Sequence, residues 1–529
     1  MSKSNTKDKT PTVEVGVNDK NLDKTKSPAD DDGAQWDIED KQKQDVILIG
    51  IATKQCKFFH DSQGEVFAKI SLNNHTEIWN LTSMGFRDWI SHQLWSQHQE
   101  GLSNASLDSA LATLRGIATF DSPTEEVYLR VAQINNELYI DLCNEDWQVI
   151  KIDSIRWSVI KKSPVSFIRS KNMRALKIPK TKGDINLLKK HINIKEKDFV
   201  LVVGWLLMSM QAGTGAYPMI VLTGSAGCGK TTISRMLREL VDPNVATLLS
   251  KPKTGDLRVV GANNHVLAFD NLSGIGANQS DALCKISTGD NQTVRKLYTT
   301  NEEFTISLKK PILLNGIDEI AKRSDMASRS IKIELSKLQN YSSETSIWNA
   351  FMIDVPSILG GLLDGLSAAL NQYENTRINN LPRMGDFSKW ATAAGPTYGW
   401  MKDEFMIAYT ENLEQSYLDS IESSEFASAL VLMFDNLPEF KGSPIELLTQ
   451  LELLDINGNI KNVRTAKGVT EQLSRYDNAL NKLGIFIKKC RDRTNKTVLI
   501  ITKDVSTYNR VVKTNSQSDE DWLKDYDLS

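Results

Sequence analysis

Residues 224–231 have the spacing of a phosphate-binding loop. They read Gly-Ser-Ala-Gly-Cys-Gly-Lys-Thr, which matches G-x-x-x-x-G-K-[ST], and they lie between the apolar run 217–222 and a helical pattern that begins at Thr232. Glycines let backbone N–H groups turn inward around phosphates, and the start of a helix adds a positive dipole. We expect Lys230 to reach the β- and γ-phosphates of ATP. The predicted ATP site consists of Gly224, Ser225, Ala226, Gly227, Cys228, Gly229, Lys230, Thr231 and Thr232.

A magnesium ion at this loop needs a hydroxyl and a carboxylate. Thr231 supplies the hydroxyl, and Asp270, which ends the apolar run 266–269, supplies the carboxylate. The next residue, Asn271, stands where such sites commonly have a glutamate that polarises the attacking water. An amide orients water but cannot accept its proton, so we expect hydrolysis to be slow or to use another acid such as Asp281.

Two more candidate catalytic residues follow along the chain. Asn315 ends the apolar run 311–314, where its amide can sense the γ-phosphate and orient water, although a plain turn residue is the alternative. Arg329 precedes a predicted strand at 331–333 and can project across a subunit boundary onto a neighbour's γ-phosphate. Arg323 is a second candidate for that role, and a structural salt bridge is the alternative for either arginine.

The elements that must position these residues form an α/β pattern. Apolar runs alternate with helical patterns between 184 and 335, which predicts a parallel sheet covered by helices. The regions predicted for the whole chain are a disordered tail over 1–44, an α+β accessory domain over 46–175, the ATPase core over 184–335, a helical region over 336–440, a basic module over 441–505 and an acidic tail over 506–529.

The composition and length of the apolar runs over 46–175 predict an accessory domain that contains both strands and helices. We expect strands at 46–51, 66–70, 127–131, 137–142 and 147–152, and helices at 85–97 and 107–117. Ser106 is predicted to cap the second helix. The histidines of the region lack metal-ligand spacing, and no paired acids or zinc ligands indicate a primase. These histidines are His60, His75, His92 and His98.

Bulk composition favours a folded protein of the cell interior. Hydrophobic residues make up 40% of the 529 residues and charged residues 24%. The longest apolar stretch, 199–208, is too short to cross a bilayer, and the first residues lack a secretory apolar region. The five cysteines form no C-x-x-C pair. We therefore expect a cytoplasmic protein without a membrane partner.

Positive charge is concentrated near the C-terminus. The whole chain has a net charge of -3, but residues 457–503 contain eleven lysines and arginines against three acids, a local net charge of +8. Their order of helix, helix and β-ribbon is similar to a winged helix, in which 469–483 is the recognition helix. The alternative is a merely solvated surface. The predicted DNA contacts are Arg475, Lys482, Lys488, Lys489, Arg491, Arg493 and Lys496.

The motifs, in this order, resemble the AAA+ ATPases of the superfamily 3 helicase type, especially the helicase half of primase-helicases of phages, plasmids and integrative elements. The resemblance is specific over about 185–335 and extends loosely to about 505. It implies an ATP- and Mg²⁺-dependent motor that forms a homo-oligomeric, hexameric ring on single-stranded or forked DNA, with a primase or other replication partner. It also implies a DNA-gripping hairpin, in which Arg295 and Lys296 make the contacts because acids occupy the turn.

Two alternatives stay open. The first is an ATP-dependent switch or scaffold that binds DNA or protein without translocating, which Asn271 in place of an acid favours. The second is an enzyme whose N-terminal domain has its own nuclease or primase chemistry.

Overall fold

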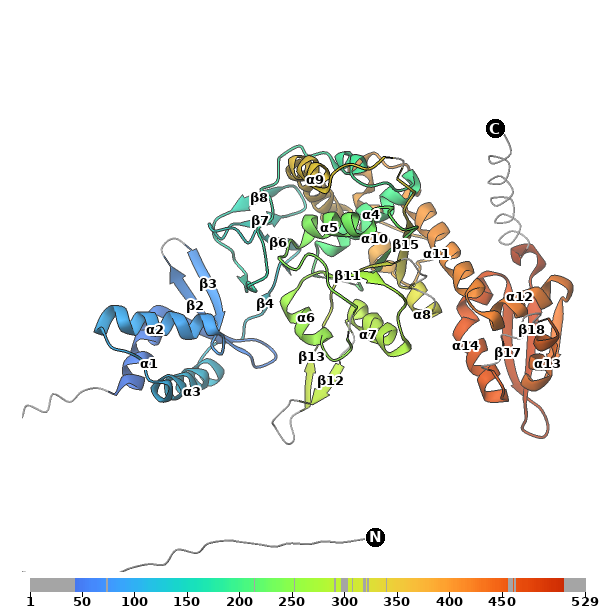
Figure 1. Ribbon diagram of the computed structural model, residues 1–529, viewed down its shortest axis with the longest axis horizontal. Helices are drawn as coiled ribbons and strands as arrows, with labels where there is room; N and C mark the ends of the chain where they lie inside the picture. Colours follow the sequence, from blue (N-terminus) through green and yellow to red (C-terminus); the bar gives the residue numbers. More distant parts are fainter. Residues whose placement is uncertain are drawn as a thin grey trace, which may run out of the picture.

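The structure is a computed structural model that describes residues 43–508, apart from 73–74, 214, 252, 290–291, 296–302, 307, 317–319, 321–322, 339, 455–459 and 461–462. The tails predicted over 1–44 and 506–529 lie almost wholly outside the described residues, as does Lys296. Figure 1 shows a small N-terminal module, a central body and a C-terminal module at the opposite end of the body.

The N-terminal module is a three-stranded antiparallel sheet with three helices. Its sheet has the order β1-β2-β3. Its elements are α1 (Gln44–Gln55), β1 (Cys56–His60), β2 (Val66–Leu72), β3 (His75–Asn80), α2 (Met84–His98) and α3 (Asn104–Phe120). Their apolar side chains form a hydrophobic core of their own, which includes Leu48, Phe86 and Leu114.

Two predictions for this module are wrong. The range 46–51, predicted as a strand, is helical, because Leu48, Ile51 and Ala52 are buried at helical spacing. A short apolar run rich in β-branched residues does not distinguish a strand from a buried helix turn. The cap of α3 is Ser103 rather than Ser106, and the Ser103 hydroxyl accepts a hydrogen bond from the Ser106 backbone N–H at 3.2 Å.

A second antiparallel sheet, in the order β5-β6-β7-β8, follows. Its elements, with a short parallel pair beside it, are β4 (Val127–Tyr128), β5 (Val131–Ile134), β6 (Glu137–Asp141), β7 (Val149–Ile152), β8 (Trp157–Ile160) and β9 (Ser166–Phe167). Val131, Leu138 and Ile152 belong to the same hydrophobic core as the helices of the central body. The range predicted as one accessory domain therefore contributes to several hydrophobic cores, one of which is continuous with the body.

The central body is built on four parallel strands in the order β11-β14-β10-β15. These strands are β10 (Met219–Thr223), β11 (Leu267–Leu272), β14 (Ile312–Gly316) and β15 (Ser330–Glu334). Side chains alternate between the two faces along β10. Ile220 and Leu222 pack with the helices of one core, and Met219 and Val221 pack with those of another. Helices thus cover both faces of the sheet, as the alternation of strands and helices predicts.

The remaining elements of the body connect or cover these strands. They are η1 (Ile185–Lys190), α4 (Glu196–Ser209), α5 (Lys230–Val241), α6 (Leu257–Asn263), α7 (Ala277–Thr288), β12 (Gln292–Arg295), β13 (Glu303–Ile306) and α8 (Ser324–Ala327). The first core contains side chains of α4 and α5, and the second contains side chains of α6 and α7. Strands β12 and β13 pair antiparallel and project from the body beside α6 and α7 (Figure 1).

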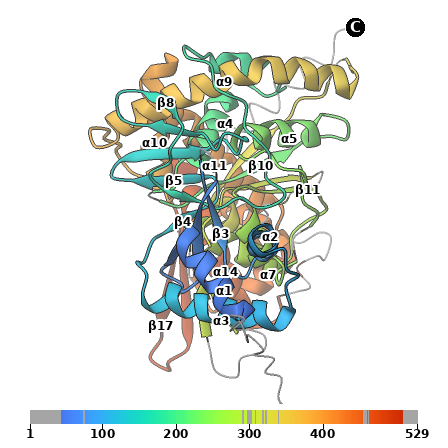
Figure 2. The ribbon, with the colours of Figure 1, turned by 90° about the vertical axis from the view of Figure 1, so that its left-hand side faces the viewer.

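A helical layer leads from the sheet to the C-terminal module. Its elements are α9 (Glu344–Gln372), α10 (Gly385–Ala394), η2 (Gly395–Tyr398) and α11 (Glu404–Glu422). Figure 2 shows α9 running across one end of the body. Among the described helices, α9 alone has the length and apolar composition to cross a membrane, and 67% of its most apolar window is buried inside the protein. Such burial is typical of a core helix.

The C-terminal module has the order helix, strand, helix, helix, strand, strand. Its elements are α12 (Glu425–Asn436), β16 (Glu439–Gly442), α13 (Pro444–Leu454), α14 (Ala466–Lys482), β17 (Ile485–Arg491) and β18 (Thr497–Lys503), and its sheet has the order β16-β18-β17. The predicted helix and ribbon are present, and β16 is an additional strand. Helix α13 begins at Pro444, and the hydroxyl of the preceding Ser443 accepts the Glu446 N–H at 3.3 Å.

Candidate nucleotide site

The glycine loop, residues 224–229, joins the carboxyl end of β10 to the N-terminus of α5. Gly224, Gly227 and Gly229 have φ values of 140°, 78° and 89°, a backbone region that other residues rarely adopt. A Cβ on Gly224 would lie 2.9 Å from the backbone oxygen of Leu335. The backbone path of the loop therefore requires glycine, and the first N–H groups of α5 open onto it without intrahelical partners. These features fit a phosphate group.

Lys230 is the first residue of α5, and its ammonium lies over the loop. Its Nζ donates to the backbone oxygens of Gly224 at 2.6 Å and Ser225 at 2.8 Å. Both acceptors belong to the glycine loop, so the charge of Lys230 is held beside the backbone that would cradle a phosphate. The side chain is partly exposed, which leaves it accessible to an anion.

Thr231 and Asp270 come together from different elements. The Thr231 hydroxyl on α5 donates to Oδ1 of Asp270 on β11 at 2.9 Å. Hydroxyl and carboxylate oxygens are ligands that Mg²⁺ prefers, and this ion commonly takes one or two protein ligands with phosphate and water oxygens completing the set. No group of three His, Cys, Asp or Glu side chains suited to a metal occurs in the described part of the chain. The pair thus fits Mg²⁺ only together with a phosphate ligand.

Asn315 links α5 to the end of β11. Its side chain is buried, its Nδ2 donates to the Ser234 hydroxyl at 2.7 Å, and its Oδ1 accepts the Asn271 backbone N–H at 2.9 Å. Asn271 has a left-handed backbone, with φ of 53°, and is exposed. Both polar atoms of the Asn315 amide are therefore used within the chain. In this arrangement Asn315 positions the residue that follows Asp270.

The two arginines that could reach a neighbour's γ-phosphate, Arg329 and Arg323, each form an ion pair within the chain. Arg329 forms an ion pair with Asp325, donates to its backbone oxygen at 3.0 Å, and is 12% exposed. Burial raises the pKa of Asp325, but its hydrogen bond and ion pair with Arg329 hold the pKa below its ordinary value. Arg323 pairs with Asp281 at 3.0 Å, so Asp281, the acid considered as a substitute base, already has a cationic partner. No described contact joins either arginine to Lys230 or Asp270.

The predicted DNA contacts lie on two parts of the chain. The seven predicted contacts in the C-terminal module are exposed, and they lie on α14, on β17 and in the turn between β17 and β18: Arg475, Lys482, Lys488, Lys489, Arg491, Arg493 and Lys496. Lys489 donates to the backbone oxygen of Thr470 at 3.3 Å, which ties the ribbon to α14. Arg295 ends β12, opposite Glu303 on β13.

A buried ion pair that the sequence did not reveal holds the start of β11. The Arg130 guanidinium, from the second sheet, donates to Asp242 Oδ1 at 3.2 Å, and neither side chain is exposed. Asp242 Oδ2 accepts the backbone N–H groups of His265 and Val266 at 2.9 and 3.1 Å. Burial raises the pKa of Asp242, but Arg130 and the neighbouring cations bring it below the ordinary value. The strand that carries Asp270, β11, is thus anchored at its start.

Comparison with known proteins gives one family match. Residues 185–402 match the model of the actinomycete integrative conjugative element replication protein family. No match was found among curated proteins. Two apo structures of the NrS-1 C-terminal region are similar at 12% and 11% identity, with TM-scores of 0.40 and 0.37; they cover 86% and 88% of this chain and 99% and 100% of their own. The part of the chain that carries the glycine loop, Asp270 and Asn315 is therefore similar to replication proteins of mobile elements.

Proposed function

We propose that the chain is an ATP-dependent DNA motor, an AAA+ ATPase of the superfamily 3 helicase type that serves replication of a mobile genetic element. The observation that carries the proposal is the meeting of Lys230, Thr231 and Asp270 at one edge of a parallel sheet. Ligands bind at the carboxyl ends of strands in such sheets. The family match over 185–402 supports the replication role.

Each residue of the site has a role in ATP hydrolysis. Lys230 exchanges its carbonyl partners for phosphate oxygens and offsets their charge, while Thr231 and Asp270 hold Mg²⁺. The ion, when bound, supplies charge neutralisation on the phosphates. Asn315 fixes the backbone of Asn271, whose exposed amide orients the attacking water. Because an amide does not accept a proton, we expect a low intrinsic rate.

The motor would act as a ring on single-stranded or forked DNA in the cytoplasm, with a primase or other replication partner. In this proposal Arg329 completes the site of a neighbouring subunit, which requires it to leave Asp325. The exposed cations of the C-terminal module bind DNA as in a winged helix, in which α14 is the recognition helix. Arg295 and Lys296 add contacts from the hairpin that contains β12 and β13.

The test combines ATP hydrolysis with strand displacement on a forked substrate. Lys230→Ala and Asp270→Ala remove the phosphate and metal contacts without emptying a core, so both variants should fold and lose both activities. Lys402→Ala, an exposed lysine outside the site, is the matched control and should retain them. Undiminished turnover in Lys230→Ala would remove the basis of the proposal.

Asn271 favours a second candidate, an ATP-dependent switch that binds DNA or protein without translocating. A switch needs ATP binding at the glycine loop but tolerates very slow hydrolysis. It predicts ATP-dependent DNA binding with no strand displacement by the wild-type protein. The motor predicts displacement that stops when ATP is replaced by a non-hydrolysable analogue.

A further inference from the structure

Residues 150–182 form the most basic segment among the described residues, and it lies outside the C-terminal module. The segment contains ten lysines and arginines against one acid, Asp153, a local net charge of +9. It includes the end of β7, strands β8 and β9, and the irregular stretch that leads to η1. We call it the basic segment.

Most of these cations form no close ion pair, and Arg156 and Lys177 interact with the Asp153 and Glu239 carboxylates only at longer range. Three of them pair with carboxylates at 2.6 to 2.9 Å: Lys151 with Glu137, Arg169 with Asp141, and Arg174 with Glu239. The other seven are exposed, and none forms an ion pair with a described carboxylate: Arg156, Lys161, Lys162, Lys171, Lys177, Lys180 and Lys182. Unpaired cations at this density repel one another, and a polyanion relieves the repulsion.

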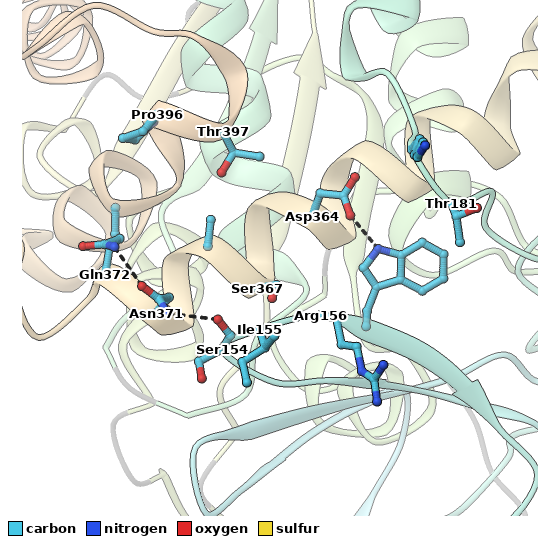
Figure 3. Close-up of a pocket in the computed structure, with 14 residues that line it drawn as sticks. Ser154, Ile155, Arg156, Thr181, Asp364, Ser367, Asn371, Gln372, Pro396 and Thr397 are labelled. Carbon is cyan, nitrogen blue, oxygen red and sulfur yellow. Dashed lines mark hydrogen bonds between the residues drawn. The ribbon is translucent and has the colours of Figure 1, made fainter.

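A pocket of about 510 Å³ opens where the basic segment meets α9 (Figure 3). The turn between β7 and β8 contributes Ile155 and Arg156, the start of β8 contributes Trp157, and the stretch before η1 contributes Thr181 and Lys182. From α9 and η2 come Asp364, Ser367, Asn371, Gln372, Pro396 and Thr397. Figure 3 shows the labelled α9 residues facing the β7–β8 turn across this space.

Hydrogen bonds fix the walls of the pocket. Asn371 Nδ2 donates to the Ser154 backbone oxygen at 3.1 Å, and the Ser367 hydroxyl donates to the Asp153 backbone oxygen at 2.7 Å. Trp157 Nε1 donates to Asp364 Oδ1 at 2.8 Å. The opposite wall is held by the Lys180 N–H, which donates to the Pro356 backbone oxygen at 2.8 Å. The pocket is therefore formed without a ligand.

The side chains that line the pocket suit the phosphate and the base of one unpaired nucleotide. Arg156 and Lys182 bring two cations, and the single carboxylate of the lining, Asp364, already accepts the Trp157 indole N–H. Ile155 is 85% exposed, an unusual position for an isoleucine, and Trp157 adds an aromatic ring. Apolar and aromatic side chains receive splayed bases, and amides such as Gln372 bond to base edges. Bases in a duplex are not available to such a pocket.

We propose that the pocket, with the cations of the basic segment that line it, forms a binding site for single-stranded DNA, in which the pocket takes one unpaired nucleotide and Arg156 and Lys182 take phosphates. None of the lining residues belongs to the candidate nucleotide site. The proposal goes beyond the DNA contacts of the C-terminal module and does not depend on ATP hydrolysis.

The test compares two charge-reversed proteins of equal net charge. The Arg156→Glu/Lys182→Glu variant alters the pocket, and the Lys54→Glu/Lys402→Glu variant alters two exposed lysines elsewhere. Fluorescence anisotropy measures the binding of oligodeoxythymidine of about 20 nucleotides, and of a duplex of the same length, at a series of salt concentrations. We expect the pocket variant to bind the single strand roughly tenfold more weakly and to lose about 1.4 from the log-log salt slope, at 0.7 per phosphate contact.

Several outcomes would overturn the proposal. Equal single-strand affinity and slope in the two variants would show that the pocket takes no part, and an equal loss for duplex would show a non-selective basic surface. Saturation of the pocket by thymidine monophosphate at concentrations that displace the oligonucleotide would identify a free-nucleotide site instead. Photocrosslinks from 4-thiothymidine in the oligonucleotide should map to the β7–β8 turn, and crosslinks confined to the C-terminal module would contradict the assignment.

The result is separable from the fate of the proposed function. ATP hydrolysis without DNA should be unchanged in the Arg156→Glu/Lys182→Glu variant, because neither residue contacts the glycine loop or Asp270. The Lys230→Ala variant should bind the oligonucleotide with wild-type affinity in the absence of ATP. A protein that hydrolyses ATP but lacks this DNA-binding site would therefore give different results from one that binds DNA at this site but does not hydrolyse ATP.

Discussion

Replacing Asn315 by leucine should weaken both the local structure and ATP hydrolysis. The buried amide donates to Ser234 at 2.7 Å and accepts from the Asn271 backbone at 2.9 Å, and leucine has a similar size but can form neither bond. Each bond contributes about 1 kcal/mol, so we expect a local loss of about 2 kcal/mol. Ser234 keeps its own donor bond to the Lys230 backbone oxygen at 2.8 Å, which limits the damage to α5.

The catalytic effect follows from the position of Asn271. Freeing its backbone N–H lets the residue after Asp270 move, and a displacement of about 1 Å at an active site can lower the rate on the order of 10²-fold. Hydrogen exchange at the Asn271 amide reports the structural loss, and steady-state ATP hydrolysis reports the catalytic one. Ser234→Ala removes one of the two Asn315 bonds, and also the Ser234 bond to the Lys230 backbone oxygen, but keeps the bond to Asn271, so it is the comparison variant in which the Asn271 amide should stay protected.

A double-mutant cycle makes the argument refutable. If Asn315 acts through the two bonds, the Asn315→Leu and Ser234→Ala effects will not add, because they share one interaction. Unchanged Asn271 exchange together with a wild-type rate in Asn315→Leu would refute the positioning role. Fast exchange with an unchanged rate would separate the structural role from catalysis and would equally contradict the account.

Three further predictions follow from the same site and its supports. Burial lowers the pKa of His265 from 6.5 to about 4, so between these pH values the unfolded chain binds a proton that the folded chain does not. The free energy of unfolding should therefore fall by about 3 kcal/mol as the pH drops from 6.5 to 4. His265→Gln should reduce this pH dependence, as measured by denaturation at a series of pH values. A slope unchanged by the substitution would assign the proton elsewhere. Thr231→Ala should raise the Mg²⁺ concentration for half-maximal hydrolysis by roughly tenfold or more, whereas Thr231→Ser, which keeps the hydroxyl, should not; equal behaviour of the two would exclude Thr231 as a ligand. Mixed rings of Lys230→Ala and Arg329→Ala subunits should hydrolyse ATP faster than either parent, because some interfaces regain both residues and removal of an arginine finger costs on the order of 10³ to 10⁵ in rate. Mass measurement must first show mixed oligomers, and baseline activity in them would make Arg329 a same-chain or structural residue.

Local patterns in the sequence were enough to predict the candidate site. The glycine loop is contiguous, and Asp270 and Asn315 each end an apolar run, so parallel strands bring them to one edge of the sheet. The four strands of the body and the C-terminal ribbon follow from the same runs. The prediction of a strand at 46–51 is wrong for a physical reason, because the buried face of a helix can contain the same β-branched residues as a strand.

Long-range partners could not be predicted in this way. Arg130 and Asp242 are 112 residues apart, and neither has a distinctive neighbour in the sequence. The pairing of Arg329 with Asp325 depends on α8, whose four residues are too few to show a helical pattern in the sequence. The basic segment begins within the predicted accessory domain over 46–175 and ends beyond it, so its charge is not apparent within either region. Its net charge of +9 exceeds the +8 of residues 457–503.

The central claim is that ATP hydrolysis at the glycine loop drives movement on DNA. Strand displacement on a forked substrate tests it most directly, with wild-type protein and the Lys230→Ala variant at equal concentration and with DNA binding measured in the same samples. The account predicts displacement by the wild-type protein only with ATP and Mg²⁺, and none by Lys230→Ala, although both bind the substrate. Displacement by Lys230→Ala, or none by a wild-type protein that binds the fork and hydrolyses ATP, would contradict it.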